Sequence, residues 1–483
     1  MDYQNITTLG ELKQAGYQPR SIKEELRKNL VEHLQKGTTV FEGIHGYENT
    51  VIPAVERAIL SGHNINFLGL RGQAKTRMAR KMVELLDEYI PVVKGAELSD
   101  DPMQPISMQA QTILEAQGDA TPIEWLHRSD RYFEKLATPD VTVADLIGDV
   151  DPIKAANLKL PYSDERTIHF GMIPRAHRSI FVINELPDLQ PRLQVALFNI
   201  LQEGDIQIRG FQLRLALDVQ FVFTANPEDY TNRGSIVTPL KDRIGSQILT
   251  HYPEDIQTAR KITAQEAKIQ ASQSQSVKVP SLAHDLLEQI SFEARQNDFI
   301  DAQSGVSARL TISALESLVS TAERRNLING SKQTTVRLTD FMGIIPAITG
   351  KVELVYEGDQ EGAQAVAENL IASAVKTMVV QYFPRMDKLK ASDEEQPYHA
   401  LIQYFGENDS LDLLFDFTDK EYQEKLKSVK PLENLRKNYL KEVAEEEHYL
   451  LMEMVLWSLA EHNKLERNEL KDSLRFSDLF GSF

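Results

Sequence analysis

Cysteine is absent from this 483-residue chain, and tryptophan occurs only twice. Without a thiol, the chain can form no disulfide, no thiolate metal site and no cysteine nucleophile. No apolar run approaches the roughly 18 residues that would suggest a membrane helix. The N-terminus, MDYQNITTLGELKQ, lacks the basic and then apolar segments of a signal peptide. We therefore expect no membrane span and a location in the reducing cytoplasm.

Positive charge is also scarce, since 53 Lys and Arg residues stand against 71 Asp and Glu residues, giving a net charge of −18. An acidic surface argues against non-specific binding to nucleic acids or anionic membranes. The chain is 42% hydrophobic and 26% charged, which suits a globular protein of two to four domains.

Helical and strand-like segments alternate between residues 37 and 256. The pattern predicts helices over 51–60, 76–89 and 190–202, and strand-like runs over 65–70, 167–170, 179–183 and 219–224. Apolar strands separated by helices indicate a parallel sheet that is covered on both faces. The runs DIQIR (205–209) and QLRLA (212–216) alternate polar and apolar residues around Gly210, which predicts an inserted β-hairpin.

Helical periodicity dominates outside this stretch. Residues 1–36 form a polar leader with an amphipathic helix that Gly37 closes, and the β signals stop near residue 257. Two polar stretches, 270–280 and 384–397, read as loops. We expect four regions: a leader (1–36), an α/β core (37–256), an α-helical lid (257–350) and a C-terminal helical extension (351–483).

Residues 65–80, INFLGLRGQAKTRMAR, predict a buried strand, a glycine-containing loop and the start of a helix. Such a loop can hold the phosphates of ATP or GTP, because its backbone N–H groups attract anions, Lys75 can reach the outer phosphates and Thr76 can hold Mg²⁺. The run departs at one position from G-x-x-x-x-G-K-[ST], since Ala74 stands where the second glycine is usual. By itself, the loop is also consistent with a turn that only joins a strand to a helix.

Two polar residues, Asn184 and Glu185, follow the apolar run SIFVI. At the carboxyl edge of an open α/β sheet they would lie where ligands bind. In nucleotide hydrolases this edge holds a Mg²⁺-coordinating acid and a carboxylate that positions the attacking water. Glu185 suits the second role, whereas Asn184 supplies no charge for the first, which predicts weak Mg²⁺ affinity or slow turnover. A strand followed by a capped turn is the simpler interpretation of the segment alone.

Three further residues suit the same site. Asn226 ends the next strand-like run and can bond a γ-phosphate or a water, although it is also an ordinary turn residue. Arg243 can reach a neighbouring subunit's phosphates, or form a surface salt bridge to Asp242 or Glu254. Arg309 can close over a nucleotide from a second domain, or be an ordinary arginine at the start of a helix.

The order of these segments resembles that of the AAA+ ATPases, in the clade that contains the MoxR-type ATPases and the ATPase (I) subunit of magnesium chelatase. GLRGQAKT is similar to the MoxR-type loop, in which alanine also precedes the lysine. HFGMIPRAHRSIFVINELPDLQPRLQVALFNILQEGDIQIRG resembles the run from the pre-Walker-B segment through the inserted hairpin. TANPEDYTNRGSIVTPLKDRIG resembles the sensor-1 and arginine-finger segment, and SARLTISALESLVSTAERR resembles the sensor-2 helix. Together they cover roughly residues 40–350.

The resemblance implies an α/β fold with a P-loop AAA+ parallel sheet core and an inserted β-hairpin, followed by an all-α lid and a C-terminal helical extension. It also implies ATP and Mg²⁺ as cofactors. The implied nucleotide contacts are Ile44, Gly46, Gly69, Arg71, Gly72, Gln73, Ala74, Lys75, Thr76 and Arg77, with Thr76 and Asn184 at the metal. Glu185 would be the catalytic carboxylate, Asn226 sensor 1, Arg243 the arginine finger acting in trans and Arg309 sensor 2.

An arginine that acts in trans implies an oligomer, expected here as a hexameric ring. The resemblance further implies an ATP-driven remodelling or chaperone-like motor, with a von Willebrand A-domain protein or a metal-insertion complex as partner. The alternatives are a nucleotide-gated scaffold with very low turnover, because Asn184 replaces the metal-binding aspartate, and a true magnesium-chelatase subunit.

A last amphipathic run, 439–465, gathers Val443, Leu450, Met454 and Trp457 on one side. It predicts either a packed helix of a C-terminal bundle or a docking face for a partner.

Overall fold

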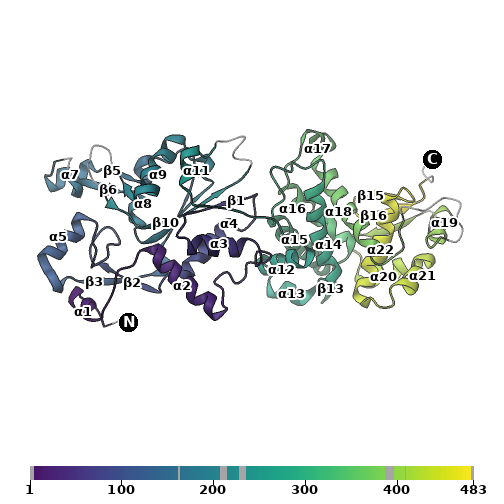
Figure 1. Ribbon diagram of the computed structural model, residues 1–483. Helices are drawn as coiled ribbons and strands as arrows, with labels where there is room; N and C mark the ends of the chain where they lie inside the picture. Colours follow the sequence, from purple (N-terminus) through teal and green to yellow (C-terminus); the bar gives the residue numbers. More distant parts are fainter. Residues whose placement is uncertain are drawn as a thin grey trace. The chain divides into compact units, whose positions relative to one another are not determined.

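A computed structural model describes residues 5–161, 164–206, 215–227, 235–386, 396–407 and 410–479 (Figure 1). The chain divides into two compact units, unit 1 (Met1–His251) and unit 2 (Tyr252–Phe483).

The centre of unit 1 is a five-stranded parallel sheet. Its strands are β1 (Ile65–Leu68), β4 (Tyr132–Leu136), β7 (Ser179–Asn184), β10 (Val219–Ala225) and β11 (Ser246–Leu249). They lie in the order β11-β1-β10-β7-β4, so the first of them in the chain lies inside the sheet and is flanked by the last two. Ligands of open α/β sheets bind beyond the carboxyl ends of the strands, at such a reversal of strand order.

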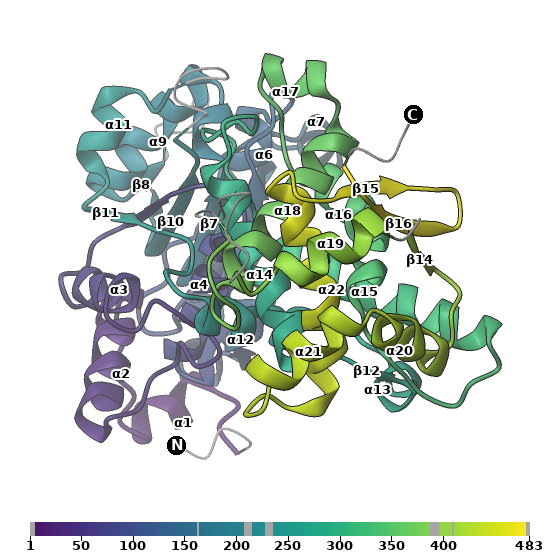
Figure 2. The same ribbon diagram turned by 90° about the vertical axis from the view of Figure 1, so that its right-hand side faces the viewer.

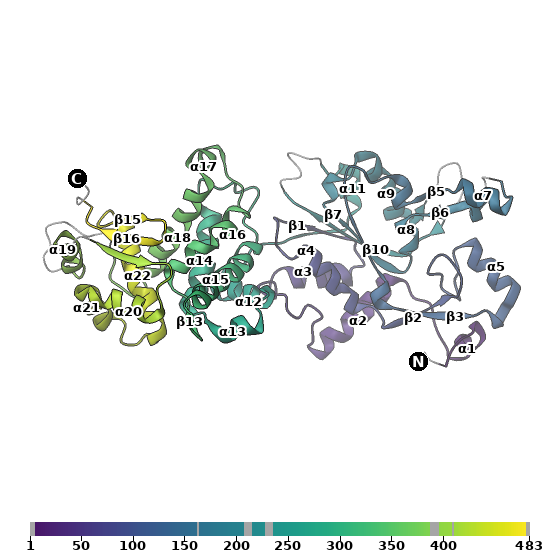
Figure 3. The ribbon, with the colours of Figure 1, turned by 180° about the vertical axis from the view of Figure 1, so that it is seen from behind.

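Helices cover both faces of this sheet, as Figures 1 and 3 show. They are α2 (Ile22–Lys36), α3 (Val51–Leu60) and α4 (Lys75–Lys81) on one face, and α9 (Pro191–Glu203) and α11 (Thr238–Arg243) on the other. Successive strand residues point to opposite faces. In β7, Ile180 and Val182 therefore pack with the α2–α4 side, and Phe181 and Ile183 with the α9–α11 side.

Most predicted elements of the core are confirmed, but one helix needs correction. α3 spans the predicted 51–60, and α2 begins at a Ser21–Glu24 capping box and ends before Gly37, whose φ is 67°. The helix predicted over 76–89 is wrong beyond Lys81, because a 3₁₀ turn (Met82–Leu85) follows it and β2 (Tyr89–Val93) begins there. The run YIPVV (89–93) is rich in aromatic and β-branched residues, which favours a strand there over the end of a helix.

Three antiparallel pairs supplement the main sheet. They are β2 with β3 (Ile123–His127), β5 (Gly148–Val150) with β6 (Ile168–Phe170), and β8 (Asp205–Ile206) with β9 (Leu215–Ala216). The run predicted over 167–170 is thus a strand outside the main sheet. The pairing of β8 with β9 matches the ends of the predicted hairpin, whereas its centre at Gly210 lies outside the described residues.

Unit 2 is mostly helical (Figure 2). Its larger helices are α12 (Ile256–Glu266), α14 (Ser281–Gln296), α15 (Arg309–Ile328), α18 (Ala363–Val379), α19 (His399–Glu407), α20 (Asp419–Ser428), α21 (Lys430–Tyr439) and α22 (Glu445–Glu461). One hydrophobic core runs from Val277 to Phe476. α22 packs within it and buries residues on nearly all sides, Leu450, Met454 and Trp457 among them. This burial favours the packed-helix interpretation of the C-terminal run.

Three expectations for unit 2 need correction. The predicted loop 270–280 contains a helix, α13 (Ala271–Ser276), and a short strand, β12 (Val277–Lys278), that pairs with β13 (Thr334–Thr335). The β structure does not stop at 257, because β14 (Leu411–Leu414), β16 (Ser473–Ser477) and β15 (Glu466–Glu469) form a further sheet. The helix expected over 439–465 is shorter at both ends, since α22 spans Glu445–Glu461 and Tyr439 is the last residue of α21.

These strands have a common physical origin. Each is only two to five residues long, and the longest buries alternate side chains, Leu474 and Phe476, against the helices. So short an alternation is masked by the helical pattern on either side. Most of the loop predicted over 384–397 lies outside the described residues.

The expected α/β architecture is confirmed: a parallel sheet covered by helices carries an inserted strand pair and is followed in the chain by a predominantly helical region. Across the described residues, no helix combines the length and the hydropathy needed to cross a bilayer.

Candidate functional site

Lys75 joins two strand ends of the main sheet. Its side chain follows the loop after β1, and its Nζ donates to Asn226 Oδ1 at 2.8 Å, just beyond the end of β10. The same ammonium donates to the loop carbonyls of Leu70, at 2.9 Å, and of Gly69. The positively charged side chain of Lys75 is thus held at the carboxyl edge of the sheet, beside the reversal of strand order.

Thr76 connects the loop to a third strand end. Its Oγ1 donates to Asn184 Oδ1 at 3.2 Å, and the hydroxyl of Thr224, on β10, donates to the same oxygen at 3.1 Å. The backbone N–H of Glu185 donates to Thr224 Oγ1 at 3.1 Å. Glu185 has a φ of 56°, in the left-handed region, so the chain turns sharply after β7.

The loop itself is closely packed. Gly69 requires the absence of a side chain, because a Cβ there would collide with Thr250 Oγ1 and Gln73 Oε1. Those two atoms are hydrogen-bonded to each other at 2.7 Å, and Gln73 is buried. Gly72 and Ala74 have φ values of 74° and 54°. Ala74 therefore occupies a left-handed position, where glycine is the residue without a steric penalty.

The segment that contains Ile44 and Gly46 lies next to this loop. Tyr47 Oη bonds the carbonyl of Gln73 at 2.9 Å and the carbonyl of His251 at 2.8 Å. Ile44 is buried in the core beneath, and Gly46 has a φ of 82°. The structure thus brings the segment predicted near the base to the loop predicted at the phosphates.

The remaining predicted residues lie at various positions. In the loop and α4, Arg71 is exposed and Arg77 half-buried. Arg243 ends α11 on the α9 side, where it donates to Gln202 Oε1 at 2.8 and 3.0 Å and lies 5.1 Å from the ring centroid of Phe198. Arg309 is the first residue of α15 and belongs to unit 2, whereas the loop belongs to unit 1.

The donor set suits a hard cation that is shared with phosphate. Mg²⁺ takes oxygen ligands and is usually held by one or two protein groups together with phosphate oxygens and waters. Thr76 Oγ1 and Asn184 Oδ1 are neighbouring oxygens at the loop. Within the described residues, no group of three or more His, Asp or Glu side chains could hold a metal without such help.

Four residues of this cluster were not predicted from the sequence: Tyr47, Thr224, Thr250 and Glu134. The first three are joined to the loop or to Asn184 by the hydrogen bonds above, and Glu134 Oε1 accepts from Asn184 Nδ2 at 2.6 Å. The alternation in YFEKL (132–136) was the available signal for Glu134, since it indicates a strand whose alternate residues share a face.

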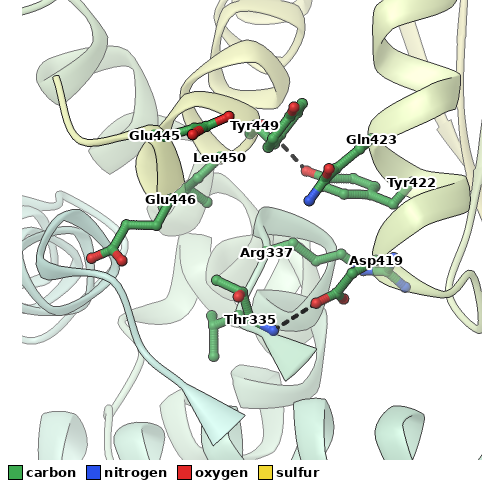
Figure 4. A pocket seen from close by; sticks show the side chains of 10 residues that line it. Thr335, Arg337, Asp419, Tyr422, Gln423, Glu445, Glu446, Tyr449 and Leu450 are labelled. Atoms are coloured by element: carbon green, nitrogen blue, oxygen red, sulfur yellow. Dashed lines mark hydrogen bonds between the residues drawn. The ribbon is translucent and has the colours of Figure 1, made fainter. Parts of the chain in front are cut away.

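A separate cavity of about 340 Å³ lies within unit 2 (Figure 4). Two of the charged residues that line it contact other residues of unit 2. Asp419 accepts from Arg325 Nη1 at 2.9 Å and from the backbone N–H of Thr335 at 2.9 Å, and the Arg337 guanidinium lies 4.8 Å from the ring centroid of Tyr422. The cavity is thus lined by residues of unit 2, whereas Lys75, Thr76, Asn184 and Asn226 belong to unit 1.

A family model described as the Sigma-54 interaction domain matches residues 161–245, which include β7, β10 and Arg243. Among solved structures, the complex of subunits BchI and BchD of magnesium chelatase matches with 17% identity and a TM-score of 0.34, over 66% of this chain and 97% of that chain. NtrX from Brucella abortus in complex with ATP matches with 15% identity and a TM-score of 0.38, over 72% of each chain. At such identities and TM-scores, nothing about the chemistry of this chain follows from them.

Proposed function

We propose that this protein binds ATP with Mg²⁺ at the Lys75–Thr76 cluster and hydrolyses it. The observation that carries the proposal is the convergence of Lys75, Thr76, Asn184 and Asn226 from three separate segments on one edge of the sheet. A cation, a hydroxyl and two amides beside a closely packed glycine loop suit a polyphosphate and its metal better than a structural turn.

The roles within the site follow from the chemistry of each group. Lys75 would exchange its loop carbonyls for phosphate oxygens, and Thr76 and Asn184 would hold Mg²⁺, which neutralises phosphate charge when bound. Glu185 would position and deprotonate the attacking water, and Asn226 would orient the same water. Ile44, Gly46 and the loop residues Gly69, Arg71, Gly72, Gln73, Ala74 and Arg77 would contact the nucleotide.

The proposal extends to assembly. Arg243 would act on a neighbouring protomer's nucleotide and Arg309 would act as sensor 2, so the active form would be a ring, proposed as a hexamer, that remodels a partner. Residues 257–350 would be the lid and 351–483 an extension. A von Willebrand A-domain protein or a metal-insertion complex is the proposed partner class.

Calorimetry with ATP and Mg²⁺ tests the nucleotide site. We expect the parent protein to bind, and Lys75→Ala to bind at least 10-fold more weakly, because the loss of a charged hydrogen bond to phosphate costs about 1.5–3 kcal/mol. Lys94→Ala, at an exposed position of unit 1, is the matched control and should bind like the parent. Equal and negligible heats of ATP binding for the parent and for Lys75→Ala would contradict the proposal.

A nucleotide-gated scaffold is the second candidate, and the neutral Asn184 favours it. The two functions differ in the effect of Glu185→Gln on ATP turnover. A motor should lose about 10²-fold or more, since general-base catalysis contributes that much. A scaffold should show the same trace rate in both proteins while ATP still binds and the size-exclusion mass still rises with ATP.

A further inference from the structure

The side-chain amide of Asn184 has only one possible orientation. Its Oδ1 accepts hydrogen bonds from the hydroxyls of Thr76 and Thr224, and its Nδ2 lies 2.6 Å from Glu134 Oε1. An ionised carboxylate can only accept, so the nitrogen must face Glu134. The amide oxygen is thereby directed to Thr76, where the metal of a nucleotide would lie.

Glu134 reaches this amide because of the sheet register. β4 pairs with β7 in parallel, with Glu134 opposite Val182 and Leu136 opposite Asn184. Residues 182 and 184 share one face by strand alternation, and Val182 packs on the side of α4. Glu134 is therefore on the α4 face, one step below the strand end, and contacts Asn184 diagonally.

The Glu134 carboxylate is held by both of its oxygens. Oε1 accepts from Asn184, while Oε2 accepts from Arg80 Nη2 at 2.8 Å and from Tyr132 Oη at 3.1 Å. The Glu134 side chain is 24% exposed, and that of Arg80 is 64% exposed, so solvent screens this ion pair. Burial raises the pKa of Tyr132, which keeps its hydroxyl protonated as a donor. The Glu134 oxygen on the side of Thr76 and Asn184 is Oε1, which accepts the hydrogen bond from the Asn184 amide.

We propose that Glu134 is a positioning residue of the nucleotide site that supplies, through the Asn184 amide, the negative charge that residue 184 lacks. The inference rests on the proposed function. An amide whose N–H donates to a carboxylate is polarised and carries more negative charge on its oxygen, which makes Oδ1 a stronger acceptor for the metal or its waters. The pairing also accounts for asparagine at 184, because an aspartate there would face a second carboxylate at hydrogen-bond distance.

The variant Glu134→Gln tests the charge alone, since a glutamine oxygen can still accept from Asn184. We expect Mg²⁺ to bind the complex with ATPγS about 10-fold more weakly, a typical effect of altering a group behind a metal ligand. Affinity for ATPγS in EDTA should be unchanged. Calorimetry over a Mg²⁺ series measures both quantities without turnover, and thermal melting checks that the protein is folded.

Two further variants separate a charge effect from a structural one. Asn184→Asp combined with Glu134→Gln returns a carboxylate to the strand end and should restore Mg²⁺ affinity to the parent level or above. Glu124→Gln, at an exposed position of β3, is the matched control and should behave like the parent. Should Glu134→Gln melt far below the parent, Arg80→Gln replaces it; this change frees the carboxylate of its exposed partner and should tighten Mg²⁺ binding.

The outcomes distinguish the inference from the function on which it rests. A parent protein that binds no ATPγS removes the proposed function, and the inference with it. A parent that binds ATPγS, together with a Glu134→Gln protein of unchanged Mg²⁺ affinity, overturns the inference alone. A double variant that melts like the parent but does not recover Mg²⁺ affinity does the same, as does weaker Mg²⁺ binding by Arg80→Gln.

Discussion

At the scale of single residues, the backbone at Ala74 departs from what a side chain prefers. Its φ of 54° lies in the left-handed region, just before Lys75 begins α4. An L-residue pays roughly 1–2 kcal/mol there, while a glycine loses about 0.5–1 kcal/mol more entropy on folding. The conformational strain of alanine at this position is thus larger than the extra folding entropy that a glycine would lose.

Ala74→Gly should therefore raise the free energy of unfolding of unit 1 by about 0.5–1 kcal/mol. Urea denaturation followed by circular dichroism measures this change. Ala116→Gly, at an exposed position of helix α5 (Met108–Gln117), is the matched control and should lower stability by about 1 kcal/mol, because the helix there has ordinary geometry. A loss of stability in both variants would mean that Ala74 is not strained.

The sequence located some residues of the candidate site but not others, for a physical reason. Lys75, Thr76 and Asn184 belong to short runs whose residue types predict phosphate and metal binding. Glu134 and Thr250 have no such run, and their role depends on a strand register or on a hydrogen bond to Gln73. Contacts between segments far apart in the chain leave no local pattern.

At the scale of elements, helix α2 is fastened to the sheet by a buried ion pair. Glu25 accepts two hydrogen bonds from the Arg131 guanidinium, both at 2.7 Å, and the side chains are 6% and 0% exposed. Arg131 also donates to the carbonyl of Arg178 at the start of β7, and Glu25 accepts from the backbone N–H of Asp87. The leader helix is thereby joined to three other segments of unit 1.

Removing one partner of this ion pair should destabilise unit 1 far more than removing both. Glu25→Leu leaves the buried guanidinium without its counter-ion and should lower the free energy of unfolding of unit 1 by about 3–5 kcal/mol. Adding Arg131→Met to that variant should recover a large part of the loss. Chemical denaturation of the parent, both single variants and the double variant gives the coupling. Additive losses would show that the pair does not act as a unit.

Element types were predicted better than element partners. The helices 51–60 and 190–202 and the strands of β1, β7 and β10 have clear apolar periodicity, and the structure contains them. β4 and β11 were missed, because their burial is partial and their sequences are mixed in polarity. The strands of unit 2 were missed because each is short and flanked by helices.

At the scale of the whole molecule, the two units have separate hydrophobic cores. In unit 2, Glu453 lies fully buried within α22 and accepts from Tyr422 Oη at 2.5 Å. Burial raises the pKa of the Glu453 carboxyl from 4.5 to about 7. Because the folded state binds this proton more tightly than the unfolded state, the associated stability is complete below about pH 4.5 and declines as pH rises through about 7.

Glu453→Gln should remove this pH dependence, since a glutamine can bond Tyr422 without a titrating proton. We expect the variant to match the parent near pH 5 and to exceed it at pH 8 by on the order of 3 kcal/mol in the unfolding of unit 2. Thermal melts at several pH values, with Glu424→Gln on the exposed side of α20 as control, measure the difference. A constant gap between variant and parent across this pH range would contradict the expectation.

The sequence by itself determined the order of the chemical groups: a glycine-containing loop at 69–76, polar residues after two apolar strands, and a predominantly helical remainder. These features depend on neighbouring residues and are visible in short windows. Only the tertiary structure decided that β1 lies between β10 and β11, that Gln73 is bonded to Thr250, and that Glu134 stands behind Asn184. Those pairings arise from how distant segments pack, and the free energy of packing is a property of the folded chain and of no single segment.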